Sequence, residues 1–159
     1  MLTYVDRSSS YVLGVFRIVI GFLLFCHGSA KLTGWPGGGD PVELGAWPAW
    51  WAGIIEFVCG ALLVVGVGTR AAAFLASGTL AVAYFWSHQP DALLPIENNG
   101  ETAALFCWAL FLIVFIGPGR LTLTSLWRRE SDAASTAPER SGTTGETTGA
   151  AATRSSAGV

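Results

Sequence analysis

The sequence predicts an all-α membrane protein: a bundle of four antiparallel transmembrane helices, with both termini in the cytoplasm and a disordered C-terminal tail. Its 159 residues are 52% hydrophobic and only 13% charged, whereas about 25% of a typical soluble domain is charged. Apolar stretches recur at close to the ~20 residues that cross a bilayer. The net charge of −2 gives no indication of nucleic-acid binding. The lipid bilayer is therefore the first expected partner.

Four apolar segments define the predicted helices. They occupy residues 11–31, 48–68, 70–87 and 101–117. The first is followed by an external loop at 33–46 that is rich in glycine and proline, residues typical of loops. Only Thr69 separates the second segment from the third, so these two should form an antiparallel hairpin. Gly117-Pro118-Gly119 ends the fourth segment, since Gly and Pro stop a helix.

The distribution of basic residues predicts the orientation in the membrane. Five arginines fall on one side of the predicted map: Arg7, Arg70, Arg120, Arg128 and Arg129. Lys31 is the only basic residue on the other side, among five acidic residues: Asp40, Glu43, Asp91, Glu97 and Glu101. Because Lys and Arg accumulate in cytoplasmic loops, the arginine-rich side should be cytoplasmic.

The composition changes after Trp127. Residues 131–159 are mainly Ser, Thr, Ala and Gly, with scattered charges and no bulky apolar residue. Such a stretch buries too little apolar surface to offset its ordering entropy. We therefore expect a transmembrane domain at 1–127 and a disordered cytoplasmic tail at 128–159.

Two charged residues lie inside neighbouring apolar segments. Gly14, Gly21 and Gly28 recur every seven residues, so they lie on one helix face, and Arg17 lies on the same face. Small residues mark the packing face of a membrane helix. Glu56 shares a face with the glycines of the second segment. Their backbone heights differ by roughly 9 Å at 1.5 Å per residue, so we expect them to pair, with His27 as a rival partner for Glu56. Arg17 as a topology anchor that snorkels to the cytoplasmic side is the alternative.

Further polar residues should meet at the external mouth of the bundle. His27 and Lys31 are four residues apart on one helix face, His88 closes the third segment, and Glu101 opens the fourth. Ordinary helix-end polarity is the alternative explanation for Glu101. A metal site from His27, His88 and Glu101 has no local spacing motif to support it, so no metal is predicted.

Tryptophans and cysteines have simple interpretations. Five tryptophans should form an aromatic belt at the external interface: Trp35, Trp47, Trp50, Trp51 and Trp86. A sharper hypothesis is that the Trp47–Trp50–Trp51 cluster covers a lipid or quinone site. The three cysteines, Cys26, Cys59 and Cys107, are isolated within apolar runs, where cysteine usually acts as a small hydrophobic side chain.

The ordered set of landmarks resembles the DoxX family of small bacterial membrane proteins. The first segment carries Arg17, Gly21 and His27-Gly28-x-x-Lys31-Leu32. The second carries Glu56, Gly60, Leu62-Leu63, Gly66 and Thr69-Arg70, and the fourth ends in Gly117-Pro118-Gly119-Arg120-Leu121. The resemblance covers about residues 12–123. The chain departs from the family pattern at Thr122 and Thr124, where the family often has Ser and Asp.

The resemblance implies a four-helix protein of the bacterial plasma (inner) membrane. Some members are similar to the small subunit of thiosulfate:quinone oxidoreductase, and others are linked to membrane complexes that handle redox stress. By this likeness Arg17, His27, Lys31 and Glu56 occupy the polar core. The first hypothesis is thus an oxidoreductase subunit that couples a redox partner to the quinone pool.

In that hypothesis Glu56 exchanges protons with quinone, His27 relays them outward, and Arg17 holds Glu56 or polarises a quinone carbonyl. The substrate or quinone site would include Lys31 and Trp51, with His88 and Glu101 at its mouth. The sequence has no flavin, haem or iron–sulfur motif, so electrons would come from a soluble redox partner. Whether the chain is itself an enzyme is left open.

Three alternatives remain. The chain is a non-catalytic anchor for soluble redox enzymes, a small-solute transporter with Arg17 and Glu56 in its pathway, or a thiol–disulfide enzyme. Four helices are few for a transporter unless the chain forms a homo-oligomer. A thiol enzyme needs a reactive thiolate with a resolving partner, and the isolated cysteines do not supply this pair.

Overall fold

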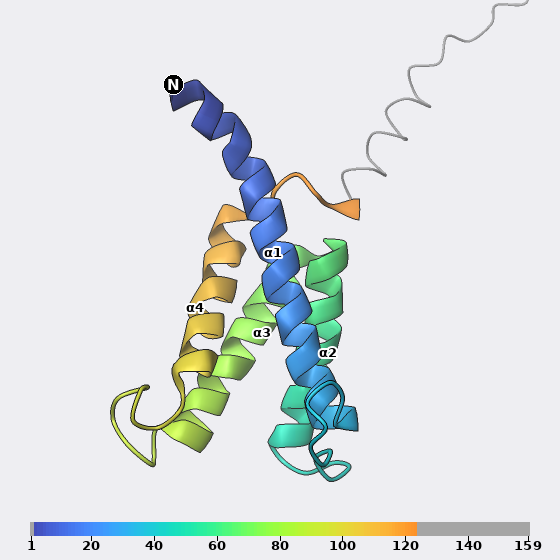
Figure 1. Cartoon of the computed structure of the whole chain (residues 1–159), viewed down its shortest axis with the longest axis vertical. Helices are drawn as coiled ribbons and strands as arrows, with labels where there is room; N and C mark the ends of the chain where they lie inside the picture. The colour runs from blue at the N-terminus through green and yellow to red at the C-terminus, as the bar shows by residue number, and fades with distance from the viewer. Residues whose placement is uncertain (1, 124–159) are drawn as a thin grey trace, which may run out of the picture.

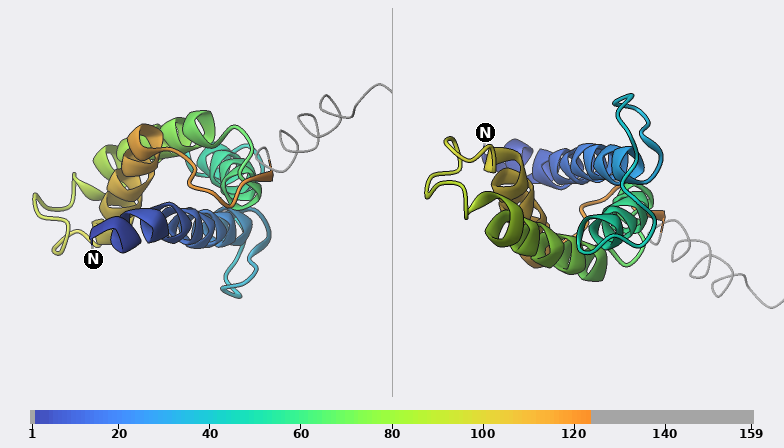
Figure 2. Two further views of the ribbon diagram at one scale, coloured as in Figure 1. Left: turned by 90° about the horizontal axis from the view of Figure 1, so that it is seen from above. Right: turned by 90° about the horizontal axis from the view of Figure 1, so that it is seen from below.

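The computed structural model describes residues 2–123, and the side chains from Ser8 onward. These residues form α-helices and no strand, which confirms the all-α prediction. The helices are α1 (Leu2–Thr33), α2 (Ala49–Val65), α3 (Thr69–Ala83) and α4 (Glu101–Ile116), and a π-helical segment, η1 (Tyr84–His88), continues α3. Successive helices run in opposite directions (Figure 1). Viewed along the bundle, they follow one another in chain order (Figure 2).

The bundle has two ends, which differ in what closes them. The N-terminal end holds the turn between α2 and α3 and the end of α4, and α1 projects beyond it (Figure 1). The loop end holds the two long connections, 34–48 and 89–100. Arg70 and Arg120 belong to the N-terminal end, and Lys31 belongs to the loop end, as the charge map predicts.

Helix boundaries differ from the predicted ones where local signals were weak. α1 begins nine residues earlier than predicted, at Leu2, because no Gly or Pro interrupts the chain before Tyr11. α2 ends at Val65, since Gly66 adopts a left-handed conformation with φ 80° and its N–H bonds the carbonyl of Leu62. The predicted third helix divides into α3 and η1.

The helices differ in length relative to a bilayer. Within the described residues, Ser8–Thr33 is the one helical stretch both long and apolar enough to cross a membrane, with 26 residues and a mean hydropathy of 2.0. α2 and α4 are apolar but shorter, at 17 and 16 residues. Large apolar side chains are nevertheless exposed on all four helices, including Phe22, Val58, Phe74 and Phe115.

Close contact between α1 and α2 positions the polar core. A Cβ atom at Gly28 would collide with the backbone nitrogen of Phe57, and one at Gly60 would lie 2.5 Å from the backbone nitrogen of Phe25. Only glycine allows the two backbones to approach this far. Leu24 and Leu63 are fully buried beside this contact. Polar side chains on the surfaces where α1 and α2 face each other are therefore also buried inside the bundle.

The chain after α4 crosses the N-terminal end of the bundle toward α2 (Figure 1). This crossing segment, residues 117–123, bonds to α1 through the N–H of Arg120 and the carbonyl of Ser10, at 3.1 Å. Gly14 packs against the side chain of Leu121. The crossing segment thereby ties the end of α4 to α1. The predicted tail at 128–159, with Arg128 and Arg129, lies outside the described residues.

Candidate functional site between α2 and α3

Lys31 and Glu56 form an ion pair between α1 and α2. The Lys31 Nζ atom lies 2.6 Å from Glu56 Oε1. Glu56 is 1% exposed, whereas the Lys31 side chain is 31% exposed. Gly53 lies one turn before Glu56, and a Cβ atom there would lie 3.1 Å from Lys31 Cβ. The absence of that side chain leaves the lysine a path to the carboxylate.

The second carboxylate oxygen has a different environment. Glu56 Oε2 is buried and has no hydrogen-bond partner among the described residues. A buried oxygen without a partner is costly, so a further donor that reached this atom would stabilise it. Lys31 therefore joins a buried acid on one side to a more open surface on the other.

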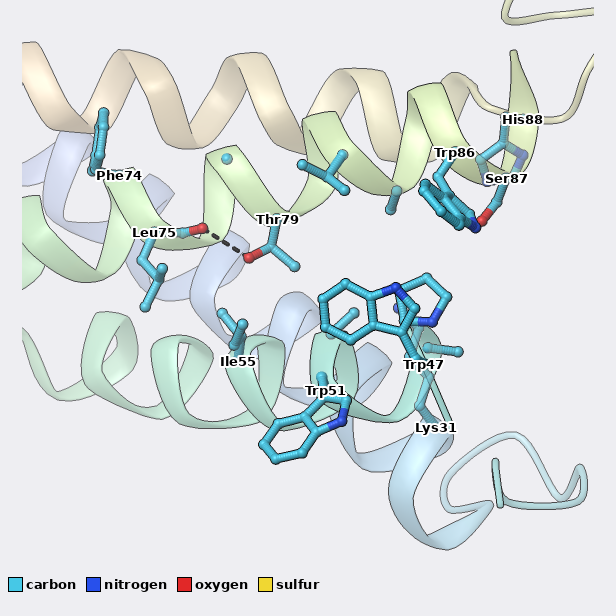
Figure 3. Close-up of a pocket in the computed structure, with 16 residues that line it drawn as sticks. Lys31, Trp47, Trp51, Ile55, Phe74, Leu75, Thr79, Trp86, Ser87 and His88 are labelled. Atoms are coloured by element: carbon cyan, nitrogen blue, oxygen red, sulfur yellow. Dashed lines mark hydrogen bonds between the residues drawn. The ribbon is translucent and has the colours of Figure 1, made fainter. Parts of the chain in front are cut away.

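That more open surface is a cavity of about 660 Å³ between α2 and α3 at the loop end. Its volume lies within the roughly 300–1,000 Å³ of common ligand pockets. The side chains drawn in Figure 3 and labelled there are Lys31, Trp47, Trp51, Ile55, Phe74, Leu75, Thr79, Trp86, Ser87 and His88. Lys31 and His88 lie at the same end of the cavity, and Phe74 and Leu75 lie at the other (Figure 3). The cavity is thus polar at one end and apolar along its length.

The cavity has an aromatic rim. Trp47 and Trp51 come from α2 and the residues just before it, and Trp86 comes from η1 (Figure 3). Trp50 packs edge-to-face on Trp51, with ring centroids 5.1 Å apart. These tryptophans belong to the predicted external belt. Of the Trp47–Trp50–Trp51 cluster, Trp47 and Trp51 line the cavity, together with Trp86, whereas Trp50 packs behind Trp51 and does not line it.

A hydrogen-bond network holds His88 at the polar end. His88 Nδ1 lies 3.1 Å from the carbonyl oxygen of Asn98. Asn98 is buried, and its side-chain amide donates to the carbonyl of Ala92 at 2.8 Å and accepts from the N–H of Gly100 at 2.8 Å. The ring of Tyr84 lies nearly parallel to the imidazole, with centroids 6.4 Å apart. π-Helical turns such as η1 recur at functional sites.

Arg17 lies at the N-terminal end instead, away from Glu56. It is 0% exposed, and its Nη2 atom donates to the carbonyl of Leu121 in the crossing segment. Its Nη1 atom packs against Gly66, where a Cβ atom would collide with it. The expected pair of Arg17 with Glu56 is therefore wrong. Lys31 takes that place because it reaches Glu56 past Gly53, while the Leu121 carbonyl binds Arg17.

The other predicted site residues divide into two groups. Lys31, Trp51 and His88 meet at the cavity. His27 is exposed and packs edge-to-face against Phe106 of α4, with centroids 5.5 Å apart, so it is not the partner of Glu56. Glu101 is exposed at the start of α4 and does not line the cavity.

Sequence reasoning missed the apolar wall that α3 contributes. Leu75, Thr79, Val82 and Trp86 line the cavity, and their spacing of three to four residues places them on one helix face. This stripe was visible in the sequence, but an apolar stripe on a membrane helix is also expected to face lipid.

Among the described residues, no cluster of side chains suits metal binding, and no two cysteines form a disulfide. No group of three His, Cys, Asp or Glu side chains between residues 2 and 123 is placed to hold a metal ion. Cys26, Cys59 and Cys107 are all free thiols. Ser77 Oγ donates to the carbonyl of Cys107 at 2.9 Å, a contact that joins α3 to α4.

Comparison with known proteins agrees with the motifs and the fold. The profile of the DoxX family matches residues 12–89, from α1 through η1. An uncharacterized protein of Haemophilus influenzae is 36% identical over 129 residues, an alignment that covers 74% of this chain and 92% of that protein. No solved structure gives a significant match. On the combined match of profile, relative and ordered motifs, the chain belongs to the DoxX family of membrane proteins.

Proposed function

We propose that this chain is the integral membrane subunit of an oxidoreductase system and binds a quinone in the cavity between α2 and α3. The observation that carries the proposal is Lys31, which is paired with the buried Glu56 and lies at the polar end of a cavity that is otherwise apolar. A quinone has the same division, with polar carbonyls on its ring and a long apolar tail.

The shape and chemistry of the cavity fit that class of molecule. Trp47, Trp51 and Trp86 offer flat apolar surfaces to a ring. Lys31 and His88 offer hydrogen-bond donors at the same end (Figure 3). Beyond them, Phe74 and Leu75 continue the cavity toward the middle of the bundle, where the tail would lie. A bound quinone would accept two electrons and two protons to become a quinol, and a bound quinol would release them.

The residues of the chain have separate tasks in this proposal. Lys31 donates a hydrogen bond to a carbonyl oxygen at the polar end. Glu56 pairs with Lys31 through Oε1, and its unpaired Oε2 is the atom that exchanges a proton during the redox step. Electrons come from a soluble redox protein, because no flavin, haem or iron–sulfur motif is present in the sequence.

We further propose that all four helices cross the bacterial plasma membrane, with the N-terminal end in the cytoplasm. Exposed apolar side chains on each helix support the crossing. Arg70 and Arg120 at the N-terminal end support the orientation, because basic residues accumulate on the cytoplasmic side. The cavity would then lie near the external face of the membrane, in reach of quinone diffusing in the bilayer.

The test is to purify the protein in native-lipid discs and to measure quinone per protein. The wild type should carry about one quinone per cavity. Glu56→Gln should carry less, because Lys31 loses the carboxylate that positions its ammonium group at the polar end of the cavity. Thr79→Phe should also carry less, because Thr79 lines the cavity and a ring there fills it.

A matched control is available for the second variant. Thr102→Phe makes the same exchange at an exposed position of α4 that does not line the cavity. It should retain the quinone content of the wild type. Quinone at the level of bulk lipid in all four proteins would refute the proposal.

A non-catalytic anchor for soluble redox enzymes is the second candidate function. One observation favours it: Arg17 and Lys31 each bind a partner that joins two elements of the fold. If these charges serve only the fold, Glu56→Gln should lower the amount of folded protein. Quinone per folded protein should then equal that of bulk lipid in both forms.

A further inference from the structure

The polar end of the cavity contains a second ionisable group, His88, which differs from Lys31 in chemistry. Lys31 is a donor only, and its charge is paired with Glu56. An imidazole is a donor when protonated and offers a lone pair when neutral. The hydroxyl of Ser87 beside it can donate or accept at any pH, so His88 is the residue at this end of the cavity whose hydrogen-bonding role depends on its protonation.

The network around His88 determines which nitrogen faces the ligand. A carbonyl oxygen only accepts hydrogen bonds, so Nδ1 must carry the proton that it shares with Asn98. Asn98 cannot turn away easily, because Ala92 and Gly100 hold its side chain. In the neutral ring the lone pair is therefore on Nε2. No hydrogen bond to Nε2 is present among the described residues.

We propose that His88 Nε2 is the group that distinguishes the reduced from the oxidised ligand in this cavity, an inference that rests on the proposed quinone site. Neutral His88 accepts a hydrogen bond from a quinol hydroxyl. Protonated His88 donates a hydrogen bond to a quinone carbonyl. The preference for one redox form over the other therefore depends on the protonation of His88.

The expected sign follows from these two states. When the pH falls and His88 becomes protonated, affinity for quinone rises and affinity for quinol falls. An unperturbed imidazole changes its charge between about pH 5 and 8, and this is the pH range to compare. One hydrogen bond gained or lost corresponds to a change of about three- to tenfold in each affinity.

Other charged groups near the ring must be separated from its effect. Lys31 lines the same cavity, with Glu56 behind it. Tyr84 stacks on the ring, and the N–H of Asp91 donates to the carbonyl of His88. Glu97 and Glu101 belong to the segment around Asn98. Any pH dependence that these groups cause remains after His88 is replaced, so the variant isolates the contribution of the imidazole.

The chain contains two histidines, and the second provides the control. His27 packs on Phe106 and does not line the cavity. The experiment measures the affinity of a short-chain ubiquinone, oxidised and reduced, between pH 5 and 8 in lipid discs. Wild type and His27→Gln should show opposite pH trends for the two forms. His88→Gln should bind both forms with the opposing trends removed.

A second measurement does not require the ligand. In ¹⁵N-labelled His27→Gln, His88 is the remaining histidine, so its two ring nitrogens are identified without ambiguity by NMR. The expected neutral form carries its proton on Nδ1. A proton on Nε2 would overturn the proposal, as would opposing pH trends that persist in His88→Gln. If neither form of the ubiquinone binds the wild type, the quinone site itself fails, and the role of His88 fails with it.

Discussion

The two ends of this bundle each bury a charged side chain from the core helices, but the partner that binds the side chain differs between them. At the N-terminal end, the fully buried Arg17 binds a backbone carbonyl of the crossing segment, which runs across that end (Figure 1). At the loop end, Glu56 binds Lys31, which also lines a cavity of about 660 Å³. Arg17 is enclosed by the chain, whereas Glu56 is separated from the cavity by Lys31.

The difference shows that burial of a charge does not by itself identify a functional site. A charged side chain at membrane depth costs roughly 2.5–3.5 kcal/mol on insertion scales, so both residues need a reason to be present. Arg17 joins α1 to the chain after α4, a structural reason. Glu56 joins α1 to α2, but its partner Lys31 also lines a cavity.

The largest effect should follow the removal of Lys31. Lys31→Met leaves Glu56 buried without its cation, which should lower the free energy of unfolding by about 3–5 kcal/mol. Chemical unfolding in lipid discs measures the change. The double variant with Glu56→Gln should recover most of the loss, since no charge then remains to be paired. No recovery in the double variant would show that Lys31 acts through packing instead.

The enclosed end can be tested at Gly66. Gly66 and Gly68 both have positive φ, 80° and 57°, which costs a residue with a side chain roughly 1–2 kcal/mol. A Cβ atom at Gly66 would also collide with Arg17, whereas one at Gly68 would meet nothing within 4 Å. Gly66→Ala should therefore destabilise by about 1–3 kcal/mol more than Gly68→Ala, because it overfills the space around Arg17. Equal losses would contradict the close packing of Arg17.

The sequence contained enough information for the helices and for the two buried charges. Apolar length located all four helices, and glycines at seven-residue spacing located the face of α1 that carries Arg17. The charge map correctly separated Arg70 and Arg120 from Lys31. These properties are local, because each depends on residues within one helix or one turn.

The pairing of the charges was not predictable in the same way. Their heights along the helices placed Arg17 and Glu56 within reach of each other. The height of a residue along its helix does not predict, however, where the chain runs after α4. The crossing segment brings the carbonyl of Leu121 to Arg17, a contact between residues 104 positions apart. The cavity also depends on how α2 and α3 separate at the loop end, which no single segment determines.

Replacement of Arg17 should separate structure from binding. Arg17→Met keeps a long side chain but leaves the carbonyl of Leu121 without its donor, which should destabilise the protein by about 1–3 kcal/mol. Quinone content per folded protein should remain that of the wild type, because Arg17 does not line the cavity. Loss of quinone in a folded Arg17→Met protein would mean that the two ends are coupled.

The smallest effect should come from the cysteines. Cys59 is buried in the core between α1 and α2, while Cys26 and Cys107 are half-buried and free. Replacing all three with Ala removes three sulfur atoms, of which one leaves a small cavity, and should cost on the order of 1 kcal/mol. Quinone content and its response to Glu56→Gln should not change, because none of the three thiols lines the cavity between α2 and α3. A triple variant that folds but loses the proposed redox function in cells would instead make a thiol the reacting group, and the Lys31–Glu56 pair would then be structural, like Arg17.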